Sequence, residues 1–232
     1  NDQHPMPGIP PTSSLRRHFV DQFFLTQVAQ LPEGAAVLDL GGHKSQKRGL
    51  FDIRRYPLRV TTLNLTRDKG VDVVADAASL PIKSSVFDAV VCAELLEHVP
   101  DPRTVLGGAH RVLRPGGTLL AAVPFLFWIH ADPHDYGRYT EQYWRESLAQ
   151  LGFGDVTVAP HGAYWCSMMD MIRSDAIESR KQGLGGGPIR RWFVDHLLAW
   201  GRKIAVAKET ELAKQPAYRK RFAAGYGIIA RS

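Results

Sequence analysis

The sequence predicts a doubly wound α/β protein on a mostly parallel sheet of seven strands, and two patterns carry this prediction. Short apolar runs rich in Val, Leu and Ala alternate with stretches of helical spacing, as is typical of strands buried on both faces. Between residues 86 and 125 a strand, a helix, an RPGG turn and a second strand follow at the spacing of a right-handed crossover. With 232 residues and 44% hydrophobic content, one full-sized core is expected.

The elements are expected in the following order. Residues 1–14, rich in Pro and Ser, predict a flexible N-terminal arm, and a single domain is expected over 15–232. LRRHFVDQFFLTQVAQL, which starts at Leu15, predicts an amphipathic helix. The expected strands are AAVLDL, VTTLNL, VDVVADA, VFDAVVCAEL, TLLAAVPF, VTVAP and YGIIAR.

Residues 163–218 break the alternation and predict a helical insertion before the last strand. Two helical patterns are divided by GLGGGP, and the second begins at Pro188, a favourable first residue of a helix. Its apolar stripe contains Ile189, Trp192, Phe193, Leu197 and Trp200. Such a stripe indicates a face that docks on the rest of the domain, a helix that lies on a membrane surface, or a homodimer contact.

The net charge of +6 is unevenly distributed. Residues 173–232 carry 13 Lys or Arg against 5 Asp or Glu. Solvated helix faces account for this excess, and an acidic substrate, an anionic lipid or a nucleic acid fits it as well. Neither a membrane span nor a leader peptide is expected from the sequence pattern, and Cys92 and Cys166 are expected to be reduced thiols. We therefore expect a cytoplasmic protein.

The stretch VLDLGGHKSQKRGLF places a glycine turn directly after the first strand. A dinucleotide fingerprint needs G-x-G-x-x-G, and the matching positions hold Gly41, His43 and Gln46. A seat for a pyrophosphate is therefore not expected. Asp39, Gly41 and Gly42 still give a sharp turn at the carboxyl edge of a parallel sheet, where ligands of open α/β folds bind. The expected ligand is a nucleoside without phosphates.

Polar side chains follow the next strands at the same edge. Asn64 ends the second strand, where an amide can bind ribose hydroxyls, and Asp76 beside Ala77 ends the third, where a carboxylate can accept from an adenine amine. Glu94 and His98 follow the fourth strand. Any one of these residues could merely cap a helix, but their order on successive strands favours a binding site.

These residues, with VLDLGG, VVADAASLPIKSSVFDAVVCAELLEHVPDP and RVLRPGGTLL, resemble the class I S-adenosylmethionine-dependent methyltransferases. The resemblance runs from about residue 36 to 153 and implies a Rossmann-like methyltransferase fold with S-adenosylmethionine as cofactor. It implies that the methionine part is seated by Asp39, Gly41 and Gly42, the ribose by Asn64, the adenine by Asp76 and Ala77, and the sulfonium pocket by Glu94. His43 and Ser45 replace the later glycines of the family, and Asn64 replaces its commoner acidic residue.

The loop PFLFWIHADPHDYGRYT, residues 124–140, leaves the same edge after the fifth strand. His130 is the first candidate for a general base, with Asp135 to orient its ring, and His98 is the second. Arg138 and Tyr139 are candidates for acceptor binding. A polar capping loop in which Arg138 merely pairs with Asp135 is the alternative. A metal site of His130, Asp132 and His134 is conceivable, but none is expected.

The same loop resembles bacterial small-molecule methyltransferases that accompany cell-surface glycan and natural-product pathways. This implies a hydroxyl acceptor on a sugar or natural product, on an anionic or lipid-linked carrier that suits the basic insertion. Three alternatives stay open: a methyltransferase of RNA or another nucleic acid, a noncatalytic protein that binds S-adenosylmethionine, and a nicotinamide oxidoreductase. The N/D-P-P-Y signature of amino-directed nucleic-acid enzymes is missing after the fourth strand, where CAEL stands.

Overall fold

The computed structural model describes residues 14–44, 49–67, 70–130, 134–212 and 214–232. The arm expected over residues 1–14 lies outside this part of the chain, apart from Ser14, whose hydroxyl accepts from the Arg17 N–H at 3.1 Å. The chain divides into two compact units. Residues 20–125, 129–159 and 226–232 form the sheet unit, and the described residues up to 19 with 126–128 and 160–225 form the helical unit.

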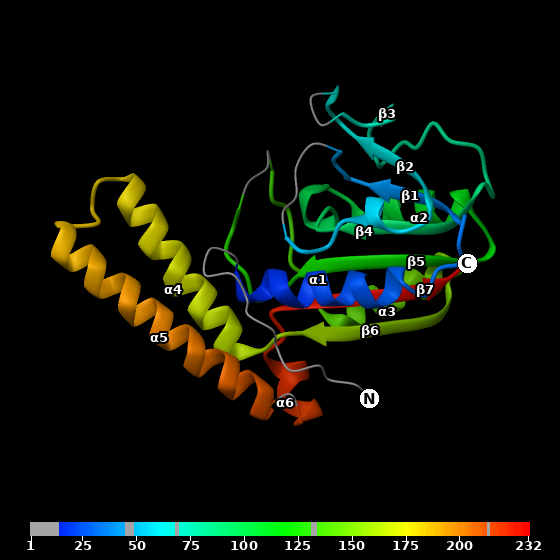
Figure 1. Cartoon of the computed structure of the whole chain (residues 1–232). Helices are drawn as coiled ribbons and strands as arrows, with labels where there is room; N and C mark the ends of the chain where they lie inside the picture. The colour runs from blue at the N-terminus through cyan, green and yellow to red at the C-terminus, as the bar shows by residue number, and fades with distance from the viewer. Residues whose placement is uncertain (1–13, 45–48, 68–69, 131–133, 213) are drawn as a thin grey trace. The chain divides into compact units, whose positions relative to one another are not determined.

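The sheet has seven strands in the order β3-β2-β1-β4-β5-β7-β6, as Figure 1 shows. All seven expected strands are present: β1 (Ala36–Leu40), β2 (Arg59–Asn64), β3 (Val73–Val74), β4 (Phe87–Ala93), β5 (Leu113–Pro124), β6 (Gly154–His161) and β7 (Gly225–Arg231). The first five pair in parallel. Ser232, just after β7, bonds to Gly116 and Gly117 near the start of β5, so β7 runs against β5. This mixed, mostly parallel sheet confirms the predicted fold class.

One face of the sheet is covered by α1 (Leu15–Val28), whose buried Val20, Phe24 and Val28 pack with apolar residues of β1, β4 and β5. Alternation along a strand places every second residue on this face. Two further helices are α2 (Pro102–Val112), capped by Asp101, and α3 (Glu141–Gln150), capped by Thr140. Short 3-10 turns are η1 (Ile53–Arg55) and η3 (Leu96–His98).

The RPGG segment differs from the expectation. It was predicted as a turn before the fifth strand, but it lies inside β5 as an irregularity of the ladder. Phe87 is paired with Leu113, whereas Ala89 is paired with Thr118, so the four residues 114–117 are looped out between two registers. Gly116 has φ of +77°, which glycine adopts without a steric cost.

Two helices of the expected insertion lie between β6 and β7, α4 (Tyr164–Lys181) and α5 (Pro188–Leu212), and a third, short helix that the sequence did not predict follows them, α6 (Pro216–Arg221). Figure 1 shows α4 and α5 side by side as a helical hairpin, and buried Cys166 and Ala205 lie in its core with Leu15. Cys92 and Cys166 are both free and buried. Among the described helices, none has the length and apolar run that crossing a membrane takes.

Candidate functional site

The register of the parallel strands brings the sequence-predicted residues to one edge of the sheet unit. Leu40 lies opposite Leu63 of β2 and Cys92 of β4, and Asn64 lies opposite Val74 of β3. The residues that follow these strands therefore leave the sheet at the same level. Asn64, Asp76, Glu94 and the glycine turn all belong to this carboxyl edge.

The glycine turn is closely packed around Asp39. Gly41 has φ of +76°, and its N–H donates to the Leu63 carbonyl at 2.8 Å. A Cβ on Gly42 would lie 2.1 Å from Oδ2 of Asp39, so any other residue at this position would force the Asp39 carboxyl group or the turn to move. Asn64 donates from Nδ2 to the carbonyls of Gly41 at 2.9 Å and Gly42 at 3.0 Å. Asn64 therefore clamps the turn, and its expected contact with ribose stays a prediction.

Asp39 itself has unusual electrostatics. Burial raises the pKa of its carboxyl to about 7, because the protein interior disfavours the charged form. A nearby cation would strongly stabilise the charged form of such a buried carboxyl group. Perturbed carboxyl groups of this kind are more frequent at functional sites than elsewhere.

The next residues along the edge are Asp76, Ala77 and Glu94. Asp76 is exposed, and its Oδ1 accepts from the Ala78 N–H at 2.8 Å, which closes a tight turn. Ala77 is buried. Glu94 has φ of +56°, a left-handed conformation that side chains rarely adopt, while its N–H donates to Ala122 at 2.9 Å. Such strain at a strand end is typical of functional positions. The cofactor roles of these residues stay predictions.

Sequence reasoning missed Glu97, which is only 2% exposed. Its Oε1 lies 3.7 Å from Nε2 of His98 and 3.9 Å from Nε2 of His130. The Glu97 carbonyl accepts from the Tyr136 N–H at 2.8 Å, which ties η3 to the loop after β5. The signal was the sequence LLEH, a charged residue inside an apolar turn that directly precedes a candidate histidine.

The tautomer of neutral His98 follows from its contacts. Nδ1 lies 2.6 Å from the His134 carbonyl, which can only accept, so Nδ1 carries the proton. Nε2 of the neutral ring is then an acceptor and faces the buried Glu97 carboxyl. The His98 and His130 rings meet edge to face, with 5.1 Å between their centroids. Two imidazoles thus converge on one carboxyl group.

His130 and Asp135 are also brought together, as the sequence predicts. The backbone N–H of His130 donates to Asp135 Oδ2 at 2.8 Å, and Nδ1 of the ring lies 3.3 Å from the same oxygen. Arg138 donates to both carboxylate oxygens of Asp135, and its Nη2 lies 3.3 Å from Nδ1 of His130. Nδ1 of His130 thus meets an acceptor and a donor at the same distance, so the contacts fix the tautomer of His98 but not that of His130.

The Arg138 contact explains the acidity of Asp135. Burial alone would raise the pKa of Asp135, but hydrogen bonds from Arg138 and from the His130 N–H, together with their charges, lower it to about 2. Asp135 is therefore a carboxylate at neutral pH and holds both residues in place. Arg138 and Asp135 do pair, which fits the capping-loop alternative and a binding role equally well, so the role of Arg138 in acceptor binding stays a prediction.

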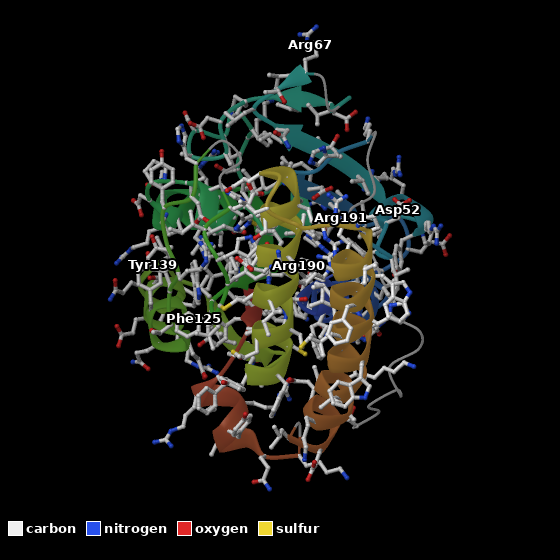
Figure 2. All side chains as sticks on the ribbon, turned by 90° about the vertical axis from the view of Figure 1, so that its left-hand side faces the viewer. Asp52, Arg67, Phe125, Tyr139, Arg190 and Arg191 are labelled. Atoms are coloured by element: carbon white, nitrogen blue, oxygen red, sulfur yellow. The ribbon has the colours of Figure 1, made fainter. Side chains whose placement is uncertain are left out.

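Tyr139, the other candidate for acceptor binding, packs against α3. Its ring is stacked on Tyr143 at 4.3 Å and lies edge to face with Trp144 at 5.3 Å. Burial, followed by the charge of Asp101, raises the pKa of its hydroxyl, so Tyr139 stays a neutral phenol. Figure 2 marks Tyr139 on the sheet unit. These contacts explain its position, and its role in binding stays a prediction.

The part of the chain that the structure describes contains one group of residues that could bind a metal ion. Glu97, His98 and His130 each offer one ligand atom, and the three atoms lie within 4.8 Å of one another. The residue Asp132, considered as a ligand from the sequence, lies outside the described residues. The Glu97 oxygen lies 3.7 and 3.9 Å from the two imidazole nitrogens, which is longer than a hydrogen bond.

A hollow of about 540 Å³ lies at the opposite edge of the sheet unit, around Asp88, Arg114 and Gly116. It is bounded by the starts of β4 and β5 rather than by their ends. Ligands of open α/β sheets bind outside the carboxyl ends of the strands, so we do not place the functional site in this hollow.

Comparison with known proteins identifies a methyltransferase domain within the sheet unit. Residues 38–121 match the family of the methyltransferase domain. A sarcosine/dimethylglycine N-methyltransferase of Halorhodospira halochloris is 31% identical over 162 residues, 57% of this chain and 56% of that protein. A ubiquinone biosynthesis O-methyltransferase of Pseudomonas paraeruginosa is 46% identical over 117 residues, 44% of this chain and 48% of that protein. The chain thus spans about half the length of the curated relatives it matches.

Solved structures share the fold at low sequence identity. Phosphoethanolamine N-methyltransferase 2 of Haemonchus contortus, solved with S-adenosyl-L-methionine, has a TM-score of 0.56 at 16% identity, over 91% of this chain and 52% of that one. The cyclase SpnF has a TM-score of 0.58 at 19% identity, and the match covers 100% of this chain and 88% of that one. The chain therefore has the Rossmann-like fold of the class I S-adenosylmethionine-dependent methyltransferases, and residues 38–121 match their methyltransferase domain.

Proposed function

We propose that the protein is an S-adenosylmethionine-dependent methyltransferase that methylates a hydroxyl group of a small molecule, such as a sugar or a natural product. The observation that carries the proposal is the convergence of His98 and His130 on the buried Glu97, at the edge that also holds the glycine turn. A hydroxyl acceptor needs a base, and this cluster offers one.

The carboxyl edge fits S-adenosylmethionine. A Cβ on Gly42 would collide with the Asp39 carboxyl group, and one on Gly41 would lie 3.2 Å from Leu95, so the two glycines let the backbone of the turn pack closely against these side chains. Asp39 offers a carboxyl group to an ammonium group, and Asp76 offers one to an adenine amine. The cofactor supplies a methyl group activated by a sulfonium. The absence of a phosphate-binding glycine pattern suits a cofactor without phosphates.

The proposed chemistry needs alignment and the removal of one proton. The acceptor oxygen forms a bond to the methyl carbon while the bond from that carbon to sulfur breaks. The hydroxyl proton passes to an imidazole. His98 is supported as the base because Nε2 of its neutral ring carries no proton and can accept one. His130 is supported because Asp135, 3.3 Å from its Nδ1, orients the ring. Glu97 stabilises the imidazolium that forms, since an opposite charge favours the charged ring.

The names of the similar proteins support a small acceptor. One is described as acting on sarcosine and dimethylglycine, and another as an O-methyltransferase of ubiquinone biosynthesis. The first favours a second candidate, an amine acceptor. An amine that attacks in its neutral form needs less help from a base than a hydroxyl does, so the histidine cluster favours the hydroxyl.

The test is turnover of His98→Gln and His130→Gln, measured as S-adenosylhomocysteine formed with panels of hydroxyl and amine acceptors. We expect the variant that lacks the base to lose about 100-fold or more, the usual scale for general base catalysis. His110→Gln is the matched control, because His110 packs on Phe153 away from the cluster.

Binding of S-adenosylhomocysteine is measured on the same variants by thermal stabilisation, which reports ligand binding through its linkage to folding. It should stay within a few fold of the parent protein, while NADH and ATP should not stabilise. Near-normal turnover in both variants would remove the histidines from the mechanism. Binding without turnover on any acceptor would favour a noncatalytic protein.

A further inference from the structure

The α5 helix carries an apolar face that is open to solvent. Ile189 is 86% exposed, and Trp192, Phe193 and Trp200 are each 60% exposed or more. Residues 189, 193, 197 and 200 follow one another at intervals of three or four, so they lie on one side of a helix. Large apolar side chains gathered in this way usually mark an interaction surface.

The opposite side of α5 holds the hairpin together. Ala205 is buried with Cys166, and the Cβ position on Gly201 lies 2.9 Å from Cε of Met169, so α4 and α5 approach closely there. Farther out, Arg180 of α4 bonds to Asp195 of α5 at 2.6 Å. The exposed apolar face is therefore held on a fixed two-helix support.

Positive charge surrounds this face. Residues 180–203 contain six Lys or Arg and a single acidic residue, Asp195, which pairs with Arg180. Figure 2 shows Arg190 and Arg191 at the end of α5 that follows the glycine-rich turn. Arg190 lies next to Ile189 and Lys203 follows Trp200 by three residues, so cations border the apolar side chains.

We propose that this face, made of Ile189, Trp192, Phe193, Leu197 and Trp200 with its bordering cations, binds the surface of an anionic lipid membrane. Tryptophan and phenylalanine prefer the interface between lipid and water, and arginine and lysine attract anionic headgroups. An amphipathic helix of this composition lies in the plane of the interface with its apolar side buried. The charge pattern favours a lipid surface over a second copy of the chain, because two copies would bring like charges together.

The proposal is tested with the whole protein and vesicles, by cosedimentation and without any turnover measurement, so it stands or falls independently of the proposed function. We expect binding to vesicles of phosphatidylcholine mixed with phosphatidylglycerol, weak binding to phosphatidylcholine alone, and weaker binding as salt screens the charges. Trp192→Ser with Phe193→Ser should abolish it.

Arg190→Glu with Arg191→Glu should weaken vesicle binding by at least about 30-fold, because two cations worth roughly 1 kcal/mol each near the surface are lost and the two glutamates are repelled in addition. The matched control is Arg67→Glu with Lys83→Glu, which makes the same change in net charge at exposed residues of the sheet unit. Leu65→Ser controls for the loss of an exposed apolar side chain. All these positions are exposed, and circular dichroism checks that each variant folds.

Equal binding of the parent protein and the α5 variants would overturn the proposal, and so would the absence of binding to anionic vesicles. If the parent protein is a dimer by light scattering and the Trp192–Phe193 variant a monomer, while neither binds vesicles, the face is a homodimer contact instead and the membrane assignment fails.

Discussion

Asp39 combines burial with a position at the turn, and this makes its contribution to stability dependent on pH. Its pKa is about 7 in the folded protein against an ordinary value of 3.8. Between these values the folded state holds a proton that the unfolded state has released. The stabilisation is therefore complete below about pH 4 and is lost as the pH rises through 7.

Asp39→Asn removes this titration. We expect the variant to be more stable than the parent protein at pH 8, and the difference to shrink as the pH falls toward 4, in urea unfolding without cofactor. Glu33→Gln makes the same change in charge at an exposed residue and serves as the control. A difference that does not change with pH would contradict the assignment of the raised pKa to Asp39.

Gly42 depends on the same carboxyl group, so the two residues should be coupled. Gly42→Ala places a Cβ 2.1 Å from Asp39 Oδ2, and the turn must shift to relieve the contact. We expect a loss of stability and of S-adenosylhomocysteine affinity, both smaller in an Asp39→Ala background where the carboxylate is gone. Gly154→Ala is the control, because Gly154, like Gly42, has no positive φ, and nothing lies within 4 Å of its added Cβ. Additive effects of the two changes would show that the contact is not made.

Single residues also mark how far the sequence could predict the site. The order of Asp39, Asn64, Asp76 and Glu94 along the strands follows from the pattern, because parallel strands bring their carboxyl ends to one edge. The contacts of Glu97 could not be read from it, since they depend on the turn of η3 that directs this side chain inward. For Asn64 the sequence predicted a contact with the ribose, which stays a prediction, and it gave no sign that the amide also bonds to the glycine turn.

Among the elements, long periodic segments were predictable and short ones less so. The first residue of α5, Pro188, and the strand content of the sheet follow from local preferences for proline and for buried apolar runs. β3 has only two residues, although VDVVADA suggested a longer strand. The RPGG segment is looped out because of the register in which β4 and β5 pair. Such a register between two separate strands cannot be predicted from the local sequence of either one.

At the scale of the whole molecule, the sheet unit and the helical unit are expected to have separate roles. The match to the methyltransferase domain, residues 38–121, falls entirely within the sheet unit, and so do the residues of the candidate site. The exposed apolar face belongs to the helical unit. If the units have separate roles, removing the outer part of the α4–α5 hairpin should affect only one of them.

The deletion replaces residues 176–196 by a linker of about four Gly and Ser residues, a common length between antiparallel helices. It keeps Cys166, Gly201 and Ala205, whose contacts hold the inner part of the hairpin together. We expect S-adenosylhomocysteine to stabilise the shortened protein as it does the parent, with affinity within a few fold, while binding to anionic vesicles is lost. Loss of cofactor binding in a folded variant, shown by unchanged circular dichroism of the remaining elements, would mean that the hairpin supports the cofactor site. Retained vesicle binding would move the lipid-binding surface elsewhere, because Trp192 and Phe193 are absent from the shortened chain.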